Sequence, residues 1–394
     1  MKTSPLLLLF SASLLAAATP PLGGPLASFL GKPELNIQDL FDGERFSNIV
    51  VSLDGTLVAT WGAQNIRVRR SEDGGKSWGS EIPVTPGIHA GGVTVDEKSG
   101  DILLFAHPKH PERDGQTAPR SLHRSQDQGK TWKKVEAQYP KDANGYIPSL
   151  HMSEHGITLR NCQHAGRLIR PARVYRKSPE RYSTAVYSDD GGKTWIPSQP
   201  VPIQGCGEGN LLELSNGQLL YTARRSFFAK GEELRHQRHY ALSKDGGQTW
   251  QNPSYFKSLP DGPRYRGEKG RGANYNGHFG MHAGFIRLPV KGRDILLYSN
   301  ADHDGHERQN LTIWGSFDAG KTWPIKRLIV PGPGAYSSLA AGRPGTPSQG
   351  KLYLQYEYGQ GKQRYKGCRI ATFNLAWLLK GKPTGDGKLP DWVK

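Results

Sequence analysis

The stretch that decides the fold is Ser71-Glu-Asp-Gly-Gly-Lys-Ser-Trp78, because the chain repeats its pattern four more times. In every copy Asp stands two residues after Ser, Gly four, Ser or Thr six, and Trp seven. The Asp side chain can accept hydrogen bonds from backbone N–H groups of its own loop, and Gly supplies a positive φ. Each copy therefore predicts a self-contained turn that its Trp closes. The other copies begin at Ser125, Ser188, Ser243 and Ser316.

The repeated Asp is a structural residue in this interpretation. A carboxylate that occurs five times at the same place in a turn is a device of the fold rather than a catalytic group. We therefore assign no chemistry to the five box aspartates, Asp73, Asp127, Asp190, Asp245 and Asp318.

The spacing of these boxes predicts an all-β, six-bladed β-propeller. The boxes start 54, 63, 55 and 73 residues apart, and short apolar runs lie between them. Four short strands in each unit of this length are typical of a propeller blade. Five blades carry a box, and residues 351–357 and 368–373 supply the sixth, with the N-terminal strand available to complete it. The expected buried strands include residues 55–60, 101–105, 217–221 and 294–298.

The N-terminus has the order of a secretory signal. Met1 and Lys2 precede a mostly apolar stretch and the small residues Ala16-Ala-Ala18. We expect a signal peptide at 1–18, a linker at 19–36, the propeller at 37–380 and a C-terminal tail at 381–394, in a secreted or periplasmic protein. A membrane anchor is the alternative for the leader, although no later apolar run approaches the ~20 residues that span a bilayer.

Composition limits the partners. The chain has 52 Lys and Arg against 35 Asp and Glu, a formal net charge of +17. Basic surfaces attract polyanions, but the charge is scattered and no nucleic-acid-binding signature is present, so an acidic glycan fits better than a nucleic acid. The three cysteines are not clustered, and we predict neither a metal nor a cofactor.

Four further segments resemble the active-site segments of the sialidase (neuraminidase) family, whose six-bladed propellers carry Asp boxes of this spacing. They are residues 207–224, 308–314, 334–339 and 354–357. The resemblance implies that Tyr336 is the nucleophile, that Glu208 is its base, and that Glu357 supports the first arginine. It also implies a three-arginine clamp for the substrate carboxylate, formed by Arg45, Arg224 and Arg308, with Arg67 or Arg69 as the alternative to Arg45.

The chemistry of a sialic acid explains why these residue types belong together. Its carboxylate sits on the reacting carbon, so arginines can hold it with charge-assisted bidentate bonds. A carboxylate nucleophile would be repelled by that group, whereas a tyrosine with a neighbouring base would not. The resemblance thus implies an exported exo-sialidase-like retaining glycoside hydrolase, acting on terminal sialic acid or a related acidic 2-keto sugar.

One departure from the family concerns the general acid. The family's Asp is expected in the loop at 60–65, which here contains Gln64 and Asn65 but no Asp. The polar insertion at 107–114 is the best source of a replacement, with Asp114 first and His107 and His110 behind it. A solvated loop is the alternative interpretation of that insertion.

Two other functions remain open on this evidence. The missing Asp favours a sialidase-fold lectin, or an inactive propeller that binds acidic glycans through the arginines. A surface propeller that binds polyanions by charge alone is the third hypothesis. The Gly-, Arg- and His-rich stretch at 264–282 is either a basic rim for an acidic sugar or a connection without contacts.

Overall fold

The computed structural model of this protein describes an all-β molecule. It describes residues 23–89, 91–111, 121–151, 154–176, 181–203, 205–225, 237–262, 280–303, 307–361 and 363–393. The expected signal peptide at 1–18 lies outside these residues. Within the described parts of the chain, no helix is long and apolar enough to cross a membrane.

Four sheets of four or five antiparallel strands follow one another along the chain. The first contains β2 (Asn48–Val51), β3 (Leu57–Trp61), β4 (Asn65–Ser71) and β5 (Ile82–Pro86). The second contains β6 (Ile88–His89), β7 (Thr94–Val95), β8 (Ile102–His107), β9 (Ser121–Ser125) and β10 (Lys133–Val135). The third contains β11 (Ile157–Thr158), β12 (Leu168–Val174), β13 (Tyr182–Ser188) and β14 (Ile196–Pro197). The fourth contains β15 (Cys206–Glu213), β16 (Leu219–Arg225), β17 (Gln237–Ser243) and β18 (Gln251–Pro260).

The remaining strands form one eight-stranded sheet. Its members are β1 (Leu35–Asp42), β19 (Gly284–Arg287), β20 (Leu296–Ala301), β21 (Gln309–Ser316), β22 (Ile325–Ala341), β23 (Leu352–Gln360), β24 (Gln363–Phe373) and β25 (Lys382–Pro383). The short helices are η1 (Leu26–Phe29), α1 (Leu375–Leu378) and η2 (Asp391–Val393). The described residues therefore form five sheets rather than the six separate ones expected.

The long strand β22 explains this difference. Its first part pairs with β21 as far as Pro333, and from Gly334 onward it pairs with β23 instead. One uninterrupted strand thus belongs to two four-stranded arrangements. The segment expected as a C-terminal tail also joins the sheet, because β25 pairs with the start of β22.

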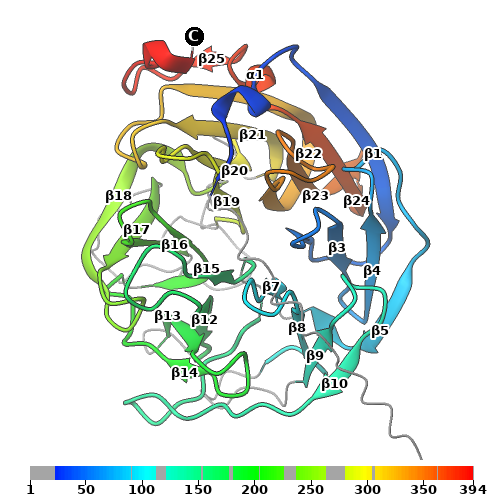
Figure 1. Ribbon diagram of the computed structural model, residues 1–394, viewed down its shortest axis with the longest axis vertical. Coiled ribbons are helices and arrows are strands. Elements are labelled where there is room, and N and C mark those ends of the chain that lie inside the picture. The colour runs from blue at the N-terminus through cyan, green and yellow to red at the C-terminus, as the bar shows by residue number, and fades with distance from the viewer. Residues whose placement is uncertain are drawn as a thin grey trace, which may run out of the picture.

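The sheets surround a common centre, with β7, β15 and β19 nearest the middle (Figure 1). Around this centre β22 contacts β2, β2 contacts β7, and β7 contacts β11, while β15 contacts β19 and β19 contacts β22. The N-terminal strand β1 closes the ring by pairing antiparallel with β24, as the sequence led us to expect. This is a propeller-like arrangement, in which residues far apart in sequence meet at the axis.

The five Asp boxes form the predicted turns. In the first, Asp73 Oδ1 accepts hydrogen bonds from the N–H groups of Lys76 and Ser77, at 2.9 and 3.1 Å, and Ser71 Oγ accepts one from Gly75 N–H at 2.8 Å. These bonds hold the pKa of Asp73 well below its ordinary value although burial opposes them. In each of the other boxes the aspartate likewise accepts the backbone N–H of the Thr four residues later, on Asp127, Asp190, Asp245 and Asp318.

Ring closure by β1 predicts a contrast between two leucines of that strand. Leu40 is 2% exposed and belongs to the hydrophobic core, whereas Leu35 is 39% exposed. Leu40→Ala should lower the free energy of unfolding by about 2–5 kcal/mol because it leaves a cavity in the core. Leu35→Ala is the matched control and should cost less than about 1 kcal/mol. Denaturant unfolding measures both, and equal losses would mean that β1 does not close the core.

Candidate active site

The centre of the site is the hydroxyl group of Tyr336, which β22 carries just after its change of partner. Tyr336 Oη donates a hydrogen bond to Glu208 Oε1 at 2.8 Å and accepts one from Arg224 Nη1 at 2.9 Å. Arg224 also forms an ion pair with Glu208 at 2.7 Å. Glu208 lies on β15 and Arg224 on β16. The expected contact between Tyr336 and Glu208 is therefore present, and all three side chains are buried.

Glu357, on β23, organises the next part of the site. Its carboxylate accepts two bonds from the Arg45 guanidinium, at 3.0 and 2.8 Å. It also accepts the backbone N–H of Phe46 at 3.1 Å and that of Tyr336 at 3.3 Å. One fully buried carboxylate thus fixes both the arginine and the backbone that carries the tyrosine. From the sequence, Glu357 was expected to support Arg45, and these two hydrogen bonds are the contact between them.

The expected arginines converge on Tyr336. The guanidinium carbons of Arg45 and Arg308 lie 5.0 and 4.8 Å from the centroid of its ring. Tyr365, on β24, connects them: its ring lies 4.0 Å from the Arg45 guanidinium carbon, and its hydroxyl accepts a bond from Arg308 at 3.1 Å. Arg45 remains partly exposed, so solvent reaches this cluster.

The alternative arginines lie elsewhere. Arg67 binds Glu81 at 2.8 Å and lies 3.7 Å from Glu44, and Arg69 lies 3.4 Å from Glu81. Among the described residues neither forms a hydrogen bond, ion pair or ring contact with Tyr336, whereas the Arg45 guanidinium carbon lies 5.0 Å from its ring. Glu44 also accepts the backbone N–H groups of residues 63–65, which hold the loop where an acidic residue was expected.

The electrostatics of the site keep Glu208 ionised. Burial raises its pKa, but the positive charges of Arg224 and Arg173 outweigh burial and bring the pKa down to about 2. The pKa of Tyr336 is raised, first by burial and then by the charge of Glu208, against the opposing effect of the arginines. At neutral pH the site therefore holds a carboxylate and a neutral phenol in direct contact.

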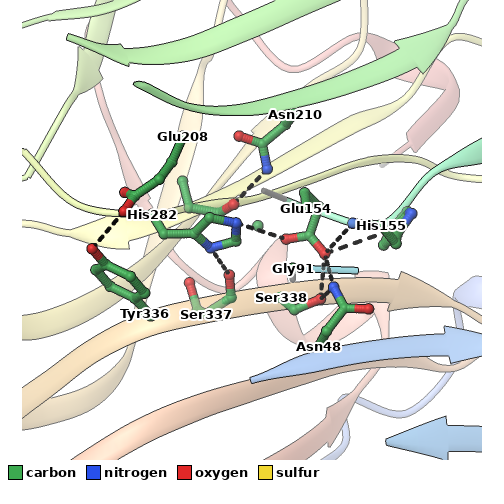
Figure 2. A network of polar contacts seen from close by, with 12 residues as sticks. Asn48, Gly91, Glu154, His155, Glu208, Asn210, His282, Tyr336, Ser337 and Ser338 are labelled. Carbon is green, nitrogen blue, oxygen red and sulfur yellow. Dashed lines mark hydrogen bonds and ion pairs between the residues drawn. The ribbon is translucent and has the colours of Figure 1, made fainter. Parts of the chain in front are cut away.

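A layer of polar side chains lies beside Tyr336 (Figure 2). Glu154 Oε1 accepts bonds from Asn48 Nδ2 at 2.6 Å and from Ser338 Oγ at 2.5 Å. Its Oε2 faces His282 Nε2 at 3.9 Å, and the His282 ring lies 5.6 Å from that of Tyr336. Burial raises the pKa of Glu154 to about 8 and lowers that of His282 to about 4. Glu154 is therefore protonated at neutral pH, and His282 is neutral.

A cavity of about 220 Å³ lies on the other side of this layer. It is lined by later residues of the strands that carry the site, including Val51 of β2, Glu213 of β15 and Ala341 of β22. Neither Tyr336 nor Glu208 lines this cavity.

The proposed sources of a general acid have different positions. Asp114 lies outside the described residues, as do residues 264–279 of the basic stretch. His107 is buried at the end of β8, and His110 is exposed. Both rings contact His151, with centroids 6.2 and 4.5 Å away. His151 in turn contacts Phe46, whose ring centroid is 6.3 Å from that of Tyr336. These histidines therefore border the site without touching Glu208.

Sequence reasoning missed several residues of the site. Tyr365 lies just before residues 368–373, which were expected to form a strand. Glu154 and Phe46 lie in segments without a recognisable motif. His282 ends the basic stretch that was noticed, but its spacing gave no indication that it would pack against Tyr336. A search for buried titratable residues next to predicted inner strands would have selected Glu154 and His282, since such residues cluster at functional sites.

Comparison with known proteins agrees with this geometry. A family model described as a BNR repeat-like domain matches residues 55–354. A sialidase from Micromonospora viridifaciens is 30% identical over 406 aligned residues, which cover 92% of this chain. The chain belongs to the sialidase family. This family member spans 56% of the length of the Micromonospora sialidase, so it corresponds to part of that relative.

Solved structures show the same fold. A Hadza microbial sialidase superposes with a TM-score of 0.62 at 22% identity, covering 85% of this chain and 66% of its own. The intramolecular trans-sialidase from Ruminococcus gnavus, solved in complex with oseltamivir carboxylate, gives a TM-score of 0.61 at 16% identity. That match covers 86% of this chain and 95% of the other. The sialidase fold thus extends over most of the chain.

The protonated Glu154 predicts a stability change with pH in this sialidase-family protein. The folded protein holds this proton up to about pH 8, whereas the unfolded chain releases it near the ordinary value of 4.5. Stability contributed by this group is therefore full below pH 4.5 and is lost as the pH rises to 8. Between about pH 6.5 and 8, above the ordinary histidine pKa, the wild type should lose about 2 kcal/mol.

Glu154→Gln tests this expectation, because an amide keeps the shape of the protonated acid but does not titrate. Denaturant unfolding at about pH 6.5 and 8 should show the loss in the wild type and not in the variant. Glu72→Gln, on an exposed carboxylate, is the control and should behave as the wild type. The same loss in both Glu154→Gln and the wild type would place the titrating group elsewhere.

Proposed function

We propose that this protein is an exo-sialidase-like retaining glycoside hydrolase that removes a terminal sialic acid or a related acidic 2-keto sugar. The observation that carries the proposal is the Tyr336 hydroxyl, held between Glu208 and Arg224 with Arg45 and Arg308 against its ring. Few other reactions need a tyrosine, its base and three converging arginines. Family membership supports the same class of activity.

The arginines bind the substrate carboxylate. Arg45, Arg224 and Arg308 come from different strands or loops and present guanidinium groups to one space, where bidentate charge-assisted bonds orient the sugar. Glu357 keeps Arg45 in place. The bound carboxylate adds a negative charge next to Glu208, which makes Glu208 a stronger base than it is in the empty site.

Tyr336 then attacks the anomeric carbon. A bond forms between Tyr336 Oη and that carbon while the bond to the leaving oxygen breaks, and the phenolic proton passes to Glu208 Oε1. Because the pKa of Tyr336 is raised and that of Glu208 is low, proton transfer accompanies bond formation rather than preceding it. Water later displaces Tyr336 from the sugar, so two inversions retain the configuration.

The leaving oxygen needs a proton from a general acid. Residues 63–65 are held by Glu44 and offer no acidic side chain, so the donor comes from the insertion at 107–114. Asp114 is our first choice, followed by His110 and His107. The absence of an acid from the expected loop also favours a second candidate, a sialidase-fold lectin that binds the acidic sugar without cleaving it.

We further propose that the propeller has six blades and that the protein is exported. The pairing of β22 supports the count of six: if the eight-stranded sheet is divided at Gly334, each half has four principal strands, like the other blades. Export is supported by the order of charged, apolar and small residues in the first 18 positions.

The covalent mechanism predicts that Tyr336→Phe loses turnover but keeps ligand binding. The variant should lower kcat on a fluorogenic sialoside by about 10³-fold or more, because it removes the nucleophile. Its affinity for 2,3-didehydro-2-deoxy-N-acetylneuraminic acid should stay within about tenfold of wild type, since the three arginines that bind the sugar carboxylate are unchanged. Tyr187→Phe is the control, because Tyr187 packs on Arg167. Undiminished turnover in Tyr336→Phe would exclude the covalent mechanism.

The proposed acid predicts different losses on different leaving groups. Asp114→Ala should lower kcat/KM on a natural sialylated glycan by about 10²–10⁴-fold, because a poor leaving group needs protonation. It should change kcat/KM on an aryl glycoside with an acidic phenol only slightly. A variant that keeps the wild-type kcat/KM on both substrates would leave Asp114 without this role, and His110→Gln would then be the variant to test. A wild type that binds both substrates and cleaves neither would be a lectin.

A further inference from the structure

Arg173, on β12, is a cation that the mechanism does not use. Its side chain is half-buried and lies over the ring of Tyr175, with the guanidinium carbon 4.8 Å from the centroid. It forms no ion pair with any residue in the described part of the chain, and its Nε is buried without a hydrogen-bond partner there. Arg45 and Arg224, by contrast, are each paired with a carboxylate of the site.

The backbone places Arg173 beside the base of the site. Arg173 pairs across the sheet with Ser183, and Ser183 Oγ donates to the carbonyl of Gly207 at 3.1 Å. Gly207 immediately precedes Glu208. Burial raises the pKa of Glu208, and the charge of Arg173 adds to that of Arg224 in lowering it. Arg173 therefore lies on the side of the site where β15 carries Glu208.

On the edge of β12 away from Ser183, the neighbour of Arg173 is the segment that carries His151. The backbone of Ser149 exchanges two hydrogen bonds with that of Arg173, at 2.7 and 2.9 Å, and His151 follows two residues later. The His151 ring is fully buried, and neither of its nitrogens has a hydrogen-bond partner among the described residues. The ring contacts Phe46, which packs on Tyr336. Arg173 and His151 thus bring unsatisfied hydrogen-bonding groups to the same side of the site.

Arg173 differs from the arginines that are expected to hold the sugar carboxylate. Arg45 and Arg224 are each balanced by a carboxylate of the site, Glu357 and Glu208. Arg173 has no such counter-ion among the described residues, and a sugar whose carboxylate is held by the other arginines would not supply one. An unpaired, half-buried cation is costly unless a ligand completes it.

We propose that Arg173 and His151 form a second anion-binding subsite, which receives a sulfate or phosphate ester group carried by the acidic sugar. The inference rests on the proposed function, because the three other arginines must hold the sugar carboxylate. A guanidinium binds the paired oxygens of such a group through two parallel hydrogen bonds, and a histidine beside it supplies a further donor. The protein would therefore prefer doubly anionic sugars to sialic acid itself.

Calorimetric binding tests this preference independently of turnover. The probes are 2,3-didehydro-2-deoxy-N-acetylneuraminic acid, its sulfate esters at O4, O8 and O9, and its phosphate ester at O9. At least one ester should bind wild type about 10- to 100-fold more tightly than the parent, as expected for a charge-assisted hydrogen-bonded pair. The sulfate and phosphate probes together identify which oxyanion is preferred.

The ratio of ester to parent affinity is the diagnostic quantity. In Arg173→Gln the ratio should fall to about one, and Arg173→Lys, which keeps the charge, should restore part of it. Arg369→Gln is the charge-matched control, because Arg369 pairs with the exposed Asp39, and it should keep the wild-type ratio. A wild-type ratio near one for every ester, or a preference that survives Arg173→Gln, would overturn the subsite.

Turnover separates this inference from the proposed function. If wild type binds an ester more tightly in an Arg173-dependent way but cleaves no sialoside, the subsite stands and the hydrolase proposal fails. If wild type cleaves the unsubstituted sialoside and shows no preference for any ester, the hydrolase proposal stands and the subsite fails. If no probe binds, both fail.

Discussion

The buried carboxylate of Glu357 is the interaction on which the rest of the site depends. A charge removed from water must be fully satisfied, and Glu357 is satisfied by Arg45 together with two backbone N–H groups. One of these belongs to Phe46 and the other to Tyr336, whose positions are 290 residues apart in the chain. Because the carboxylate is removed from water, the loss of any one of these partners would leave part of its charge unpaired and would destabilise the site.

Ring closure brings these partners together. In the antiparallel rows of the sheet, Phe41 of β1 and Glu357 of β23 both pair with Cys368 of β24. Arg45 follows β1 after a short turn in which Glu44 and Phe46 both have positive φ. The strand that completes the fold thus delivers the first arginine to its carboxylate, so stability and the geometry of the site share one set of contacts.

The sequence predicted the features that repeat or that match a known segment. The box turns recur with fixed spacing, and Tyr336, Glu208 and Arg224 lie in recognisable segments, so they could be named before the structure. The continuity of β22 could not be predicted, because nothing at Gly334 distinguishes a strand that changes partner from one that ends. Glu154, His282 and Arg173 also escaped prediction, since their importance comes from packing between sheets rather than from local pattern.

The unbroken course of β22 has a mechanical consequence. Tyr336 lies two residues after the point where this strand changes partner, and Gly334 N–H is bonded to the carbonyl of Arg308 at 3.1 Å. Over most of its length β22 is paired with one strand at a time, with β21 before Gly334 and with β23 after it, so a displacement of Tyr336 would disturb the junction between the two pairings. The position of Tyr336 is therefore tied to the pairing of two sheets, and a distortion of either pairing would move its hydroxyl group.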